Sequence, residues 1–528
     1  MAIFMVLMFL VMATIGTVII GEKTGLPWPA LTTIVTTIFV FIPGTPAIEV
    51  PPELILPIFL PPLLWALARK TSWGVIREQW ITITALSVLL VVATVFAVGA
   101  VTYLMIPAMG FASAMVVGAA VAPPDPVAVE AVAEPAGIPR RILSALQTEG
   151  LFNDAVSIVA FHLALAAVTE HEHVTPLVAV GTFLYAAAMA VVLGLLAARG
   201  AAWVVEHVEG PSARNVFVWV VPFVTYILAE ELHASGVIAV VVAGIEMHSR
   251  ASIEAEDRLS SSSFWDTVDV LFTGAAFGMI GLTVSQAIEE VGNQLWAAVG
   301  VGVAVAFVAI AVRVLMLAIV AKINRVRGRA ASAPLRAQEV LLMSWCGMRG
   351  LVTLALVLSV PIAGFPARYQ LSVIALTVLL VTMVIPGLAL PLLMKVLDVT
   401  AGPAGRSERM RARVVKRARD AAAQVMKQHY EELDPDVSAA VQHWFEQQMA
   451  YSAWFTDANI VAAGEKTERK LHAEEVRRAA YAVRREAIAA AQQALLEARN
   501  ERGINPMMVD EVLREIDRLA VLVARQPR

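Results

Sequence analysis

The sequence predicts an all-α, polytopic membrane protein with a helical domain outside the membrane at its C-terminal end. Of the 528 residues, 58% are hydrophobic, and the mean hydropathy is positive, as is typical of integral membrane proteins. Charge is unevenly distributed, because residues 1–398 carry 44 charged side chains and the much shorter stretch 399–528 carries 40. We therefore expect a transmembrane domain over residues 1–398 and a second domain over residues 399–528.

About thirteen apolar segments of the first domain have the composition of transmembrane helices. They are residues 2–20, 28–43, 53–68, 80–106, 109–135, 141–168, 177–205, 215–232, 235–248, 264–284, 291–321, 336–361 and 368–397. The first segment has neither a basic region before it nor a small-residue cleavage site. It is therefore predicted to be a retained span and not a signal peptide.

Basic residues indicate how these spans are oriented. If the N-terminus lies outside the cell, fifteen Lys and Arg residues fall in the predicted inward loops and only Arg368 falls in an outward loop. Cytoplasmic loops of membrane proteins are enriched in Lys and Arg. We therefore expect a multi-pass protein of the cell membrane (plasma or inner) with its C-terminal domain in the cytoplasm.

The C-terminal domain is predicted to be helical and regulatory. It is rich in Ala, Arg, Glu, Lys and Gln, with apolar residues three to four positions apart, and Gly402–Gly405 is a predicted linker. The chain has a single cysteine and no nucleotide-binding loop, zinc-ligand spacing or nucleophile motif, and the tail lacks interleaved aromatic and basic residues. These features argue against an enzyme, a cofactor and a nucleic-acid partner.

Two carboxylates lie where a bilayer should exclude charge. Asp125 precedes the basic turn 137–141 by nearly the same distance along the chain as Asp154 follows it. At ~1.5 Å per residue, both lie roughly 18–20 Å from the same helix ends, near the middle of the membrane. An ionised side chain there costs at least ~2.5–3.5 kcal/mol, which favours an ion site over a purely structural role.

The residues around these acids predict a broken helix packed against an intact one. Pro123, Pro124 and Pro126 surround Asp125, and prolines remove backbone donors and interrupt helices. Interrupted helices near the midplane form ion sites in secondary transporters. On the following helix, Asp154 shares one stripe with Gln147, Gly150 and Ser157, whereas Glu149 and Asn153 form a second stripe about 100° away.

An arginine interrupts a later span in the same way. Arg349 lies between Gly347 and Gly350, so a second broken or closely packed helix is predicted there. A buried charge needs a partner, and Glu149 is the expected one.

Three further residues are candidates without an assigned role. Glu130 follows Asp125 by five positions, so it is either a second titrating acid or a residue of an inner vestibule. Arg313 lies inside the span 291–321, and the sequence names no partner for it. Thr382 in the last span corresponds to the region of Asp154 if the two halves are inverted repeats.

Several motifs in the same order resemble the monovalent cation:proton antiporter-1 family of sodium/proton antiporters. They are TEGLFNDAVSIVAF, DPVAVEAV with GIPRR, AEELHASGVIAVVVAG, FGMIGL and GMRGLVTLALVLSVP. The resemblance covers about residues 1–397.

This resemblance implies thirteen spans in inverted repeats with crossed unwound helices, a homodimer, and elevator-like alternating access. It implies that Asp154 carries the cation and the proton in turn, and that Asn153 beside it is typical of electroneutral members. Asp125 would lie at the crossing, and Glu149 would pair with Arg349 as a scaffold.

Some positions depart from the family pattern. Relatives usually have Thr at Pro124, Ser at Gly150, an acid at Ala66 and Asn at Thr273. Several oxygen ligands are therefore missing together, which leaves open whether Na⁺ or K⁺ is carried and whether Ser157 or Glu130 completes the site.

We therefore predict a secondary active antiporter that exchanges Na⁺ and/or K⁺ for protons, with both ions competing for Asp154. One alternative is a proton-coupled symporter of an organic anion, which would need a roomier cavity and more cationic contacts. The other is a non-transporting membrane sensor that acts through the C-terminal tail. The missing ligands favour the sensor, whereas Asn153, Asp154 and Asp125 argue against it.

Overall fold

The computed structural model describes residues 2–42, 52–130, 137–169, 176–250, 255–328, 333–361, 365–397, 406–439, 441, 470–501 and 504–524. These residues form helices and no strand, so the predicted all-α class is confirmed. The chain divides into two compact units, one of Met1–Ala251 with Ser263–Gly402 and the other of Ser252–Ser262 with Pro403–Arg528. The second unit thus includes residues 252–262, which were expected to belong to the transmembrane domain.

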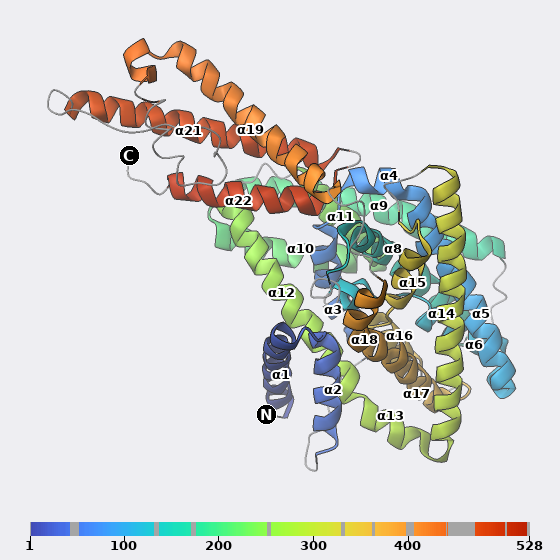
Figure 1. Ribbon diagram of the computed structural model, residues 1–528. Coiled ribbons are helices and arrows are strands. Elements are labelled where there is room, and N and C mark those ends of the chain that lie inside the picture. Colours follow the sequence, from blue (N-terminus) through green and yellow to red (C-terminus); the bar gives the residue numbers. More distant parts are fainter. Residues whose placement is uncertain are drawn as a thin grey trace. The chain divides into compact units, whose positions relative to one another are not determined.

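The helices of the first unit are labelled in Figure 1. They are α1 (Ala2–Thr24), α2 (Trp28–Val40), α3 (Pro52–Ala68), α4 (Trp73–Thr84), α5 (Leu90–Met105), α6 (Phe111–Val121), α8 (Arg140–Thr169), α9 (Pro176–His207), α10 (Pro211–Glu231), α11 (Gly236–Arg250), most of α12 (Ala255–Leu282), α13 (Val284–Val291), α14 (Leu295–Val326), α15 (Ala337–Trp345), α16 (Leu351–Ser359), α17 (Arg368–Leu379) and α18 (Ile385–Leu397). Two π-helical turns, η1 (Ala85–Leu89) and η4 (Leu380–Val384), join α4 to α5 and α17 to α18.

The first unit is a multi-pass membrane domain. Each of the thirteen predicted spans overlaps a described helix. Eight helical stretches in the described part of the chain are long and apolar enough to cross a bilayer, and three shorter apolar helices accompany them. The exact number of crossings therefore stays a prediction.

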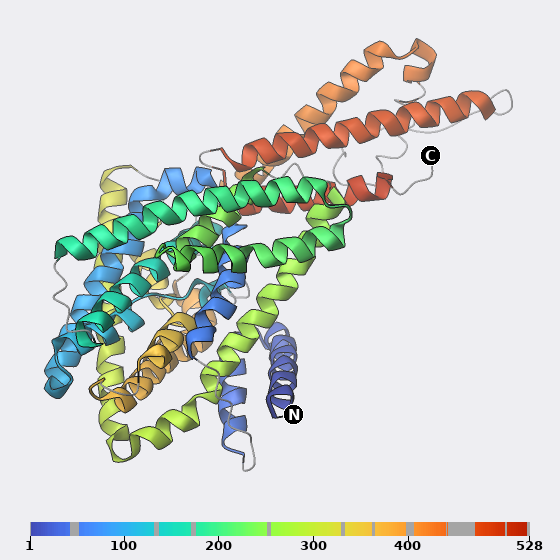
Figure 2. The same ribbon diagram turned by 180° about the vertical axis from the view of Figure 1, so that it is seen from behind.

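Burial places α6 at the centre of this unit. In its most apolar window α6 with its continuation is 83% buried, whereas α9 is only 17% buried and carries many exposed large apolar side chains. α9 runs along the front of the unit in Figure 2 and packs against α11. Because no other described part of the protein covers these apolar side chains, α9 is suited to contact with lipid tails.

Two helices of the central region are broken, as the prolines and glycines predict. Residues 122–125 separate α6 from a short helical segment that resumes at Pro126, here called half-helix 126–130. Residues 346–350 separate α15 from α16. The two breaks lie against each other, because the backbone N–H of Asp125 donates to the carbonyl of Met348 at 2.7 Å.

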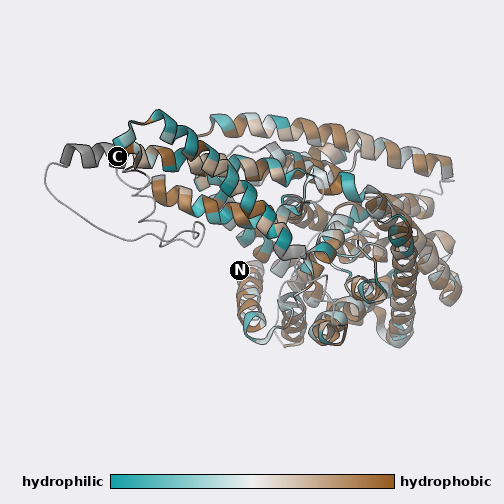
Figure 3. Ribbon diagram, turned by 45° about the horizontal axis from the view of Figure 1, so that its top comes forward, coloured by the Kyte–Doolittle hydropathy of each residue, from teal (hydrophilic) through white to brown (hydrophobic). Residues whose placement is uncertain are grey.

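The second unit is a helical domain with its own core. It contains the start of α12 together with α19 (Arg406–Glu432), α21 (Lys470–Arg499) and α22 (Pro506–Ala524). Its helices mix hydrophilic and hydrophobic stretches in Figure 3, whereas those of the first unit are mostly hydrophobic. Apolar side chains such as Val414, Leu495 and Val512 form the buried seam between the helices, as expected for helices that are amphipathic.

Candidate functional site

Asp125 lies at the N-terminal ends of two half-helices. One carboxylate oxygen accepts hydrogen bonds from the backbone N–H groups of Val127 at 2.8 Å and Ala128 at 3.3 Å. The other accepts from the N–H of Leu351, the first residue of α16, at 3.2 Å. Helix N-termini carry unpaired donors and partial positive charge, so a carboxylate is stabilised there. A side chain at Gly350 would collide with it, because a Cβ there would lie 1.6 Å from its Oδ2.

Arg349 lies at the C-terminal end of a broken helix, whereas Asp125 lies at N-terminal ends. Its Nε donates to the carbonyl of Val121, the last residue of α6, at 3.1 Å, and its guanidinium also donates to the carbonyl of Gly347. Carbonyls at a helix C-terminus are unpaired and carry partial negative charge. The predicted ion pair between Arg349 and Glu149 is therefore wrong, since free backbone carbonyls surround this arginine instead.

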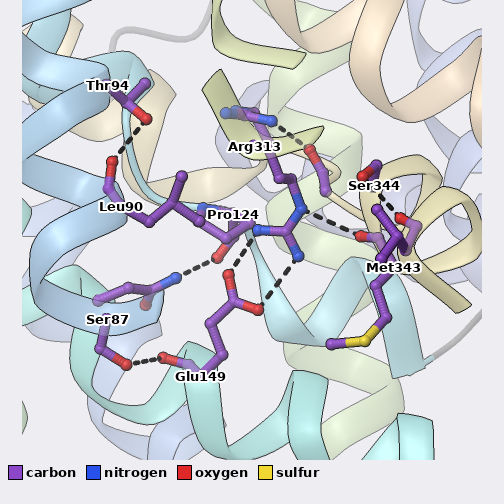
Figure 4. A network of polar contacts seen from close by, with 12 residues as sticks. Ser87, Leu90, Thr94, Pro124, Glu149, Arg313, Met343 and Ser344 are labelled. Carbon is purple, nitrogen blue, oxygen red and sulfur yellow. Dashed lines mark hydrogen bonds and ion pairs between the residues drawn. The ribbon is translucent and has the colours of Figure 1, made fainter. Parts of the chain in front are cut away.

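Glu149 pairs with Arg313 of α14. Both carboxylate oxygens face the guanidinium (Figure 4): Oε1 lies 2.5 Å from Nη1, and Oε2 lies 3.1 Å from Nη2. Both side chains are 1% exposed. Arg313 Nε also donates to the carbonyl of Met343 at 3.0 Å. The close approach requires glycine at 347, because a Cβ there would lie 2.5 Å from Cδ of Arg313. The sequence did contain a signal that Arg313 needs a carboxylate partner, although not which one. In a continuous helix the backbone carbonyls already accept hydrogen bonds within the helix. A buried arginine on such a helix therefore needs a carboxylate more than an arginine in an unwound segment does.

Asp154 is buried without a described partner. Its residue is 3% exposed, and no residue in the described part of the chain donates a hydrogen bond or forms an ion pair to its carboxylate. Asp154 is thus a carboxylate whose charge nothing on the described chain compensates.

The neighbours of Asp154 fasten α8 to the broken helix. The amide of Asn153 donates to the carbonyl of Pro124 at 2.8 Å, and the hydroxyl of Ser157 donates to the carbonyl of Ala119 at 2.5 Å. The Oδ1 of Asn153 is buried and has no partner among the described residues. It is therefore an oxygen next to Asp154 that is still able to accept or to coordinate.

Glu130 lies in a separate charged cluster. It forms an ion pair with Lys70, and Nζ of Lys70 also lies 3.4 Å from Oδ2 of Asp269 on α12. Sequence reasoning missed this contact, because Lys70 follows the end of α3 and reads as an ordinary loop lysine. No group of three or more His, Cys, Asp or Glu side chains within the described ranges could hold a metal ion.

The two π-helical turns each present a hydroxyl to the charged residues. Thr382 in η4 donates to the carbonyl of Val378 at 2.7 Å and accepts from the backbone N–H of Arg349 at 3.3 Å. Ser87 in η1 donates to the backbone carbonyl of Glu149 at 2.9 Å, as Figure 4 shows. Such turns are frequent at functional sites because they leave backbone groups out of the regular ladder. Thr382 therefore holds the break around Arg349.

Gly150 has no room for a side chain. A Cβ there would lie 2.3 Å from Cβ of Pro126, so the serine that the family resemblance implies cannot be added without displacing half-helix 126–130. We expect Gly150→Ser to destabilise the protein by about 1–3 kcal/mol, the usual cost of overpacking. Adding Pro126→Ala should recover part of the loss. Thermal melting of the purified protein in detergent measures both effects.

Gly300→Ser on α14 is the matched control, because nothing lies within 4 Å of a Cβ at that position. If Gly150→Ser melts at the same temperature as this control, the contact with Pro126 is not tight.

Comparisons with known proteins agree with this architecture. A family model described as "Sodium/hydrogen exchanger, transmembrane" matches residues 5–396. An uncharacterized Na⁺/H⁺ exchanger of Escherichia coli, YjcE, is 28% identical over 409 residues, which cover 70% of this chain and 71% of the relative. The low-affinity Na⁺/H⁺ antiporter NhaS1 of Synechocystis is 28% identical over 387 residues, 72% of each chain. The sodium proton antiporter MjNhaP1 of Methanocaldococcus jannaschii matches with a TM-score of 0.59 at 19% identity, over 77% of this chain and 99% of that structure. This last match shows a shared fold.

Proposed function

Since the chain belongs to the sodium/hydrogen exchanger family, we propose that it exchanges a monovalent cation, Na⁺ and/or K⁺, for protons across the cell membrane. The observation that carries this proposal is the carboxylate of Asp154, which is buried in the centre of the membrane unit without a described partner. An acid at such depth is costly unless its charge is compensated. A bound proton or a bound cation supplies that compensation.

Competition for Asp154 couples the two fluxes. The other central charges already have partners, because Asp125 faces two helix N-termini, Glu149 faces Arg313, and Arg349 faces backbone carbonyls. Asp154 is therefore the group that binds the proton and the cation in turn during alternating access. One proton then replaces one monovalent cation, so each cycle moves no net charge.

Ala66 and Gly150 supply no side-chain oxygen where the family resemblance implies one, which supports weak discrimination between Na⁺ and K⁺. The carbonyl of Pro124 already accepts from Asn153. The free Oδ1 of Asn153 is the clearest additional ligand. Selectivity among hard cations follows the number of ligands and the size of the cavity, so a cation that keeps part of its water suits this site.

The test uses protein reconstituted into vesicles that carry an internal acidic pH gradient and a pH-sensitive dye. We expect Na⁺ and K⁺ each to release the gradient, with half-saturating concentrations within about tenfold of each other. A tenfold ratio corresponds to about 1.4 kcal/mol. Release only by an organic anion would instead indicate a symporter, and no release by any ion would indicate a sensor.

The remaining features of the proposal are those that the family resemblance implies. We expect a homodimer in the lipid bilayer, the N-terminus outside, the C-terminal unit in the cytoplasm and a role in pH homeostasis. Fifteen basic residues in the predicted inward loops support the orientation. Labelling of single cysteines introduced at the two termini, in intact and in opened cells, tests it.

A further inference from the structure

Arg368 is buried, although the sequence places it in a predicted outward loop. It is the first residue of α17, which packs beside α16 (Figure 1), and the residue is only 7% exposed. Nε donates to the carbonyl of Val360 at 2.8 Å, Nη2 to the carbonyl of Leu358 at 3.3 Å, and Nη1 to the hydroxyl of Ser372 at 2.9 Å. A buried arginine is costly unless its donors are satisfied. These contacts therefore hold the guanidinium in one place.

Two of the three acceptors belong to the end of α16. This helix ends at Ser359, and the last carbonyls of a helix find no donor within it and carry partial negative charge. In a membrane domain little water is available to satisfy them. The guanidinium of Arg368 supplies both the donors and the positive charge. It therefore caps the C-terminal end of α16.

The opposite end of the same helix holds Asp125. Leu351, the first residue of α16, donates its N–H to the carboxylate of Asp125 at 3.2 Å. The helix has nine residues and is therefore about 14 Å long. Its N-terminus faces an acid and its C-terminus faces a base, and each is the charge that the helix dipole favours at that end. α16 is thus a short, rigid segment held by one charged side chain at each end.

The backbone beside Arg368 has an unfavourable conformation. Ala367 has a φ of 54°, in the left-handed region that residues other than glycine rarely adopt. Such a conformation persists where the surrounding contacts determine the local structure, and it is found most often at functional sites. It is a second sign that the contacts of Arg368 fix the start of α17 against α16.

Asp125 connects α16 to the surroundings of Asp154. The carbonyl of Pro124, the preceding residue, accepts from the amide of Asn153 at 2.8 Å. A shift of α16 along its axis moves the N–H of Leu351 relative to Asp125 and disturbs Pro124. The amide of Asn153 then turns, and with it the free Oδ1 that is a candidate cation ligand. All of these residues belong to the membrane unit.

We propose that Arg368 is a positioning residue for exchange. It fixes α16 from the end opposite to Asp125 and so sets the geometry of the cation site, without contact with the ion. The effect on transport rests on the proposed cation/proton exchange. The capping of α16 does not rest on it and is measurable without transport.

The first experiment compares Arg368→Gln with the wild type in the full chain reconstituted into vesicles. Glutamine keeps a polar side chain but loses the charge and the fork of donors. We expect the half-saturating Na⁺ concentration to rise about fivefold or more, with the maximal rate per folded protein within about twofold, because cation binding is what changes. A purely structural role would lower the amount of active protein at an unchanged half-saturating concentration, and that result would overturn the proposal.

Arg368→Lys is the rescue, because an ammonium also places a cation and donors at the helix end. It should return the half-saturating concentration to within about twofold of the wild type. Arg199→Gln is the matched control, since Arg199 also donates to a backbone carbonyl, that of Leu195 at 3.4 Å, but is exposed and lies within its own helix. It should leave both constants unchanged. A rise in Arg368→Lys as large as in Arg368→Gln would contradict a role for the capping charge.

The second experiment needs no transport. Hydrogen–deuterium exchange in the full-length protein follows the amide of Leu351, at the end of α16 opposite to Arg368. We expect Arg368→Gln to raise its exchange rate at least about threefold, and Arg199→Gln to leave it unchanged. A rise confined to residues 358–360 would show local fraying alone and would overturn the proposal. A response at Leu351 without cation-dependent proton flux in the wild type would refute the proposed function and keep the capping role.

Ser372→Ala keeps the proposal testable if Arg368→Gln does not fold. It removes the hydroxyl that accepts from Nη1 and leaves both carbonyl contacts in place. We expect the half-saturating Na⁺ concentration and the exchange rate of Leu351 to rise about two- to threefold, a smaller change in the same direction. Unchanged values in a folded, transporting Ser372→Ala would refute the positioning role alone.

Discussion

Asp154→Asn is expected to abolish cation-dependent proton flux with Na⁺, K⁺ and Li⁺ alike, down to the level of empty vesicles. The amide has the shape of the carboxylate but neither binds a proton near neutral pH nor carries a charge for a cation. The fold should tolerate the change, because no described residue hydrogen-bonds to the carboxylate. Dye-based flux measures activity, and melting temperature with elution volume measures folding.

Glu289→Gln is the control for this variant, since it neutralises an exposed carboxylate of the same unit. It should retain full flux. Residual cation-dependent flux in Asp154→Asn above empty vesicles would show that another acid carries the ions.

Breaking the ion pair between Glu149 and Arg313 is expected to be the most destabilising polar change in the membrane unit. Removing one partner of a buried ion pair leaves an uncompensated charge and costs roughly 3–5 kcal/mol. We therefore expect a large drop in melting temperature for Glu149→Leu and for Arg313→Met. The double variant should recover much of it, because two apolar side chains leave no charge in the interior.

An exposed pair of the second unit provides the comparison. Arg417→Gln removes a contact between side chains that are 37% and 47% exposed, and such pairs are worth about 0–1 kcal/mol. If Glu149→Leu and Arg313→Met are both as stable as this variant but inactive, the pair serves the transport site and not the scaffold.

Local sequence predicted the broken helices well, because proline and glycine act on their own segment of backbone. Pro123, Pro124 and Pro126 interrupt the helix at Asp125, and the glycines beside Arg349 mark the second break. Counting residues along two helices placed Asp125 and Asp154 at the same predicted depth, which stays a prediction. In the structure Asp154 is buried and Asp125 is capped by two helix N-termini.

Partner choice was less predictable, because it depends on which helices pack together. Arg313 lies in the uninterrupted helix α14, and nothing near it in sequence indicates Glu149, which is 164 residues away. Likewise, from sequence alone Gly150 looks like the loss of a hydroxyl ligand. In the structure glycine is required at this position, because a larger side chain would collide with Pro126.

The sequence separation of Glu149 and Arg313 has a consequence for how the protein is made. At a synthesis rate of roughly 5–20 residues per second, the carboxylate emerges from the ribosome about 8–33 s before its arginine. During that interval α8 holds an acid that lipid disfavours by at least ~2.5–3.5 kcal/mol. We therefore expect stable insertion of α8 to depend on the later arrival of α14. A chain terminated between the two helices leaves Glu149 as well as Asp154 without a partner, whereas in the finished chain Glu149 is paired with Arg313.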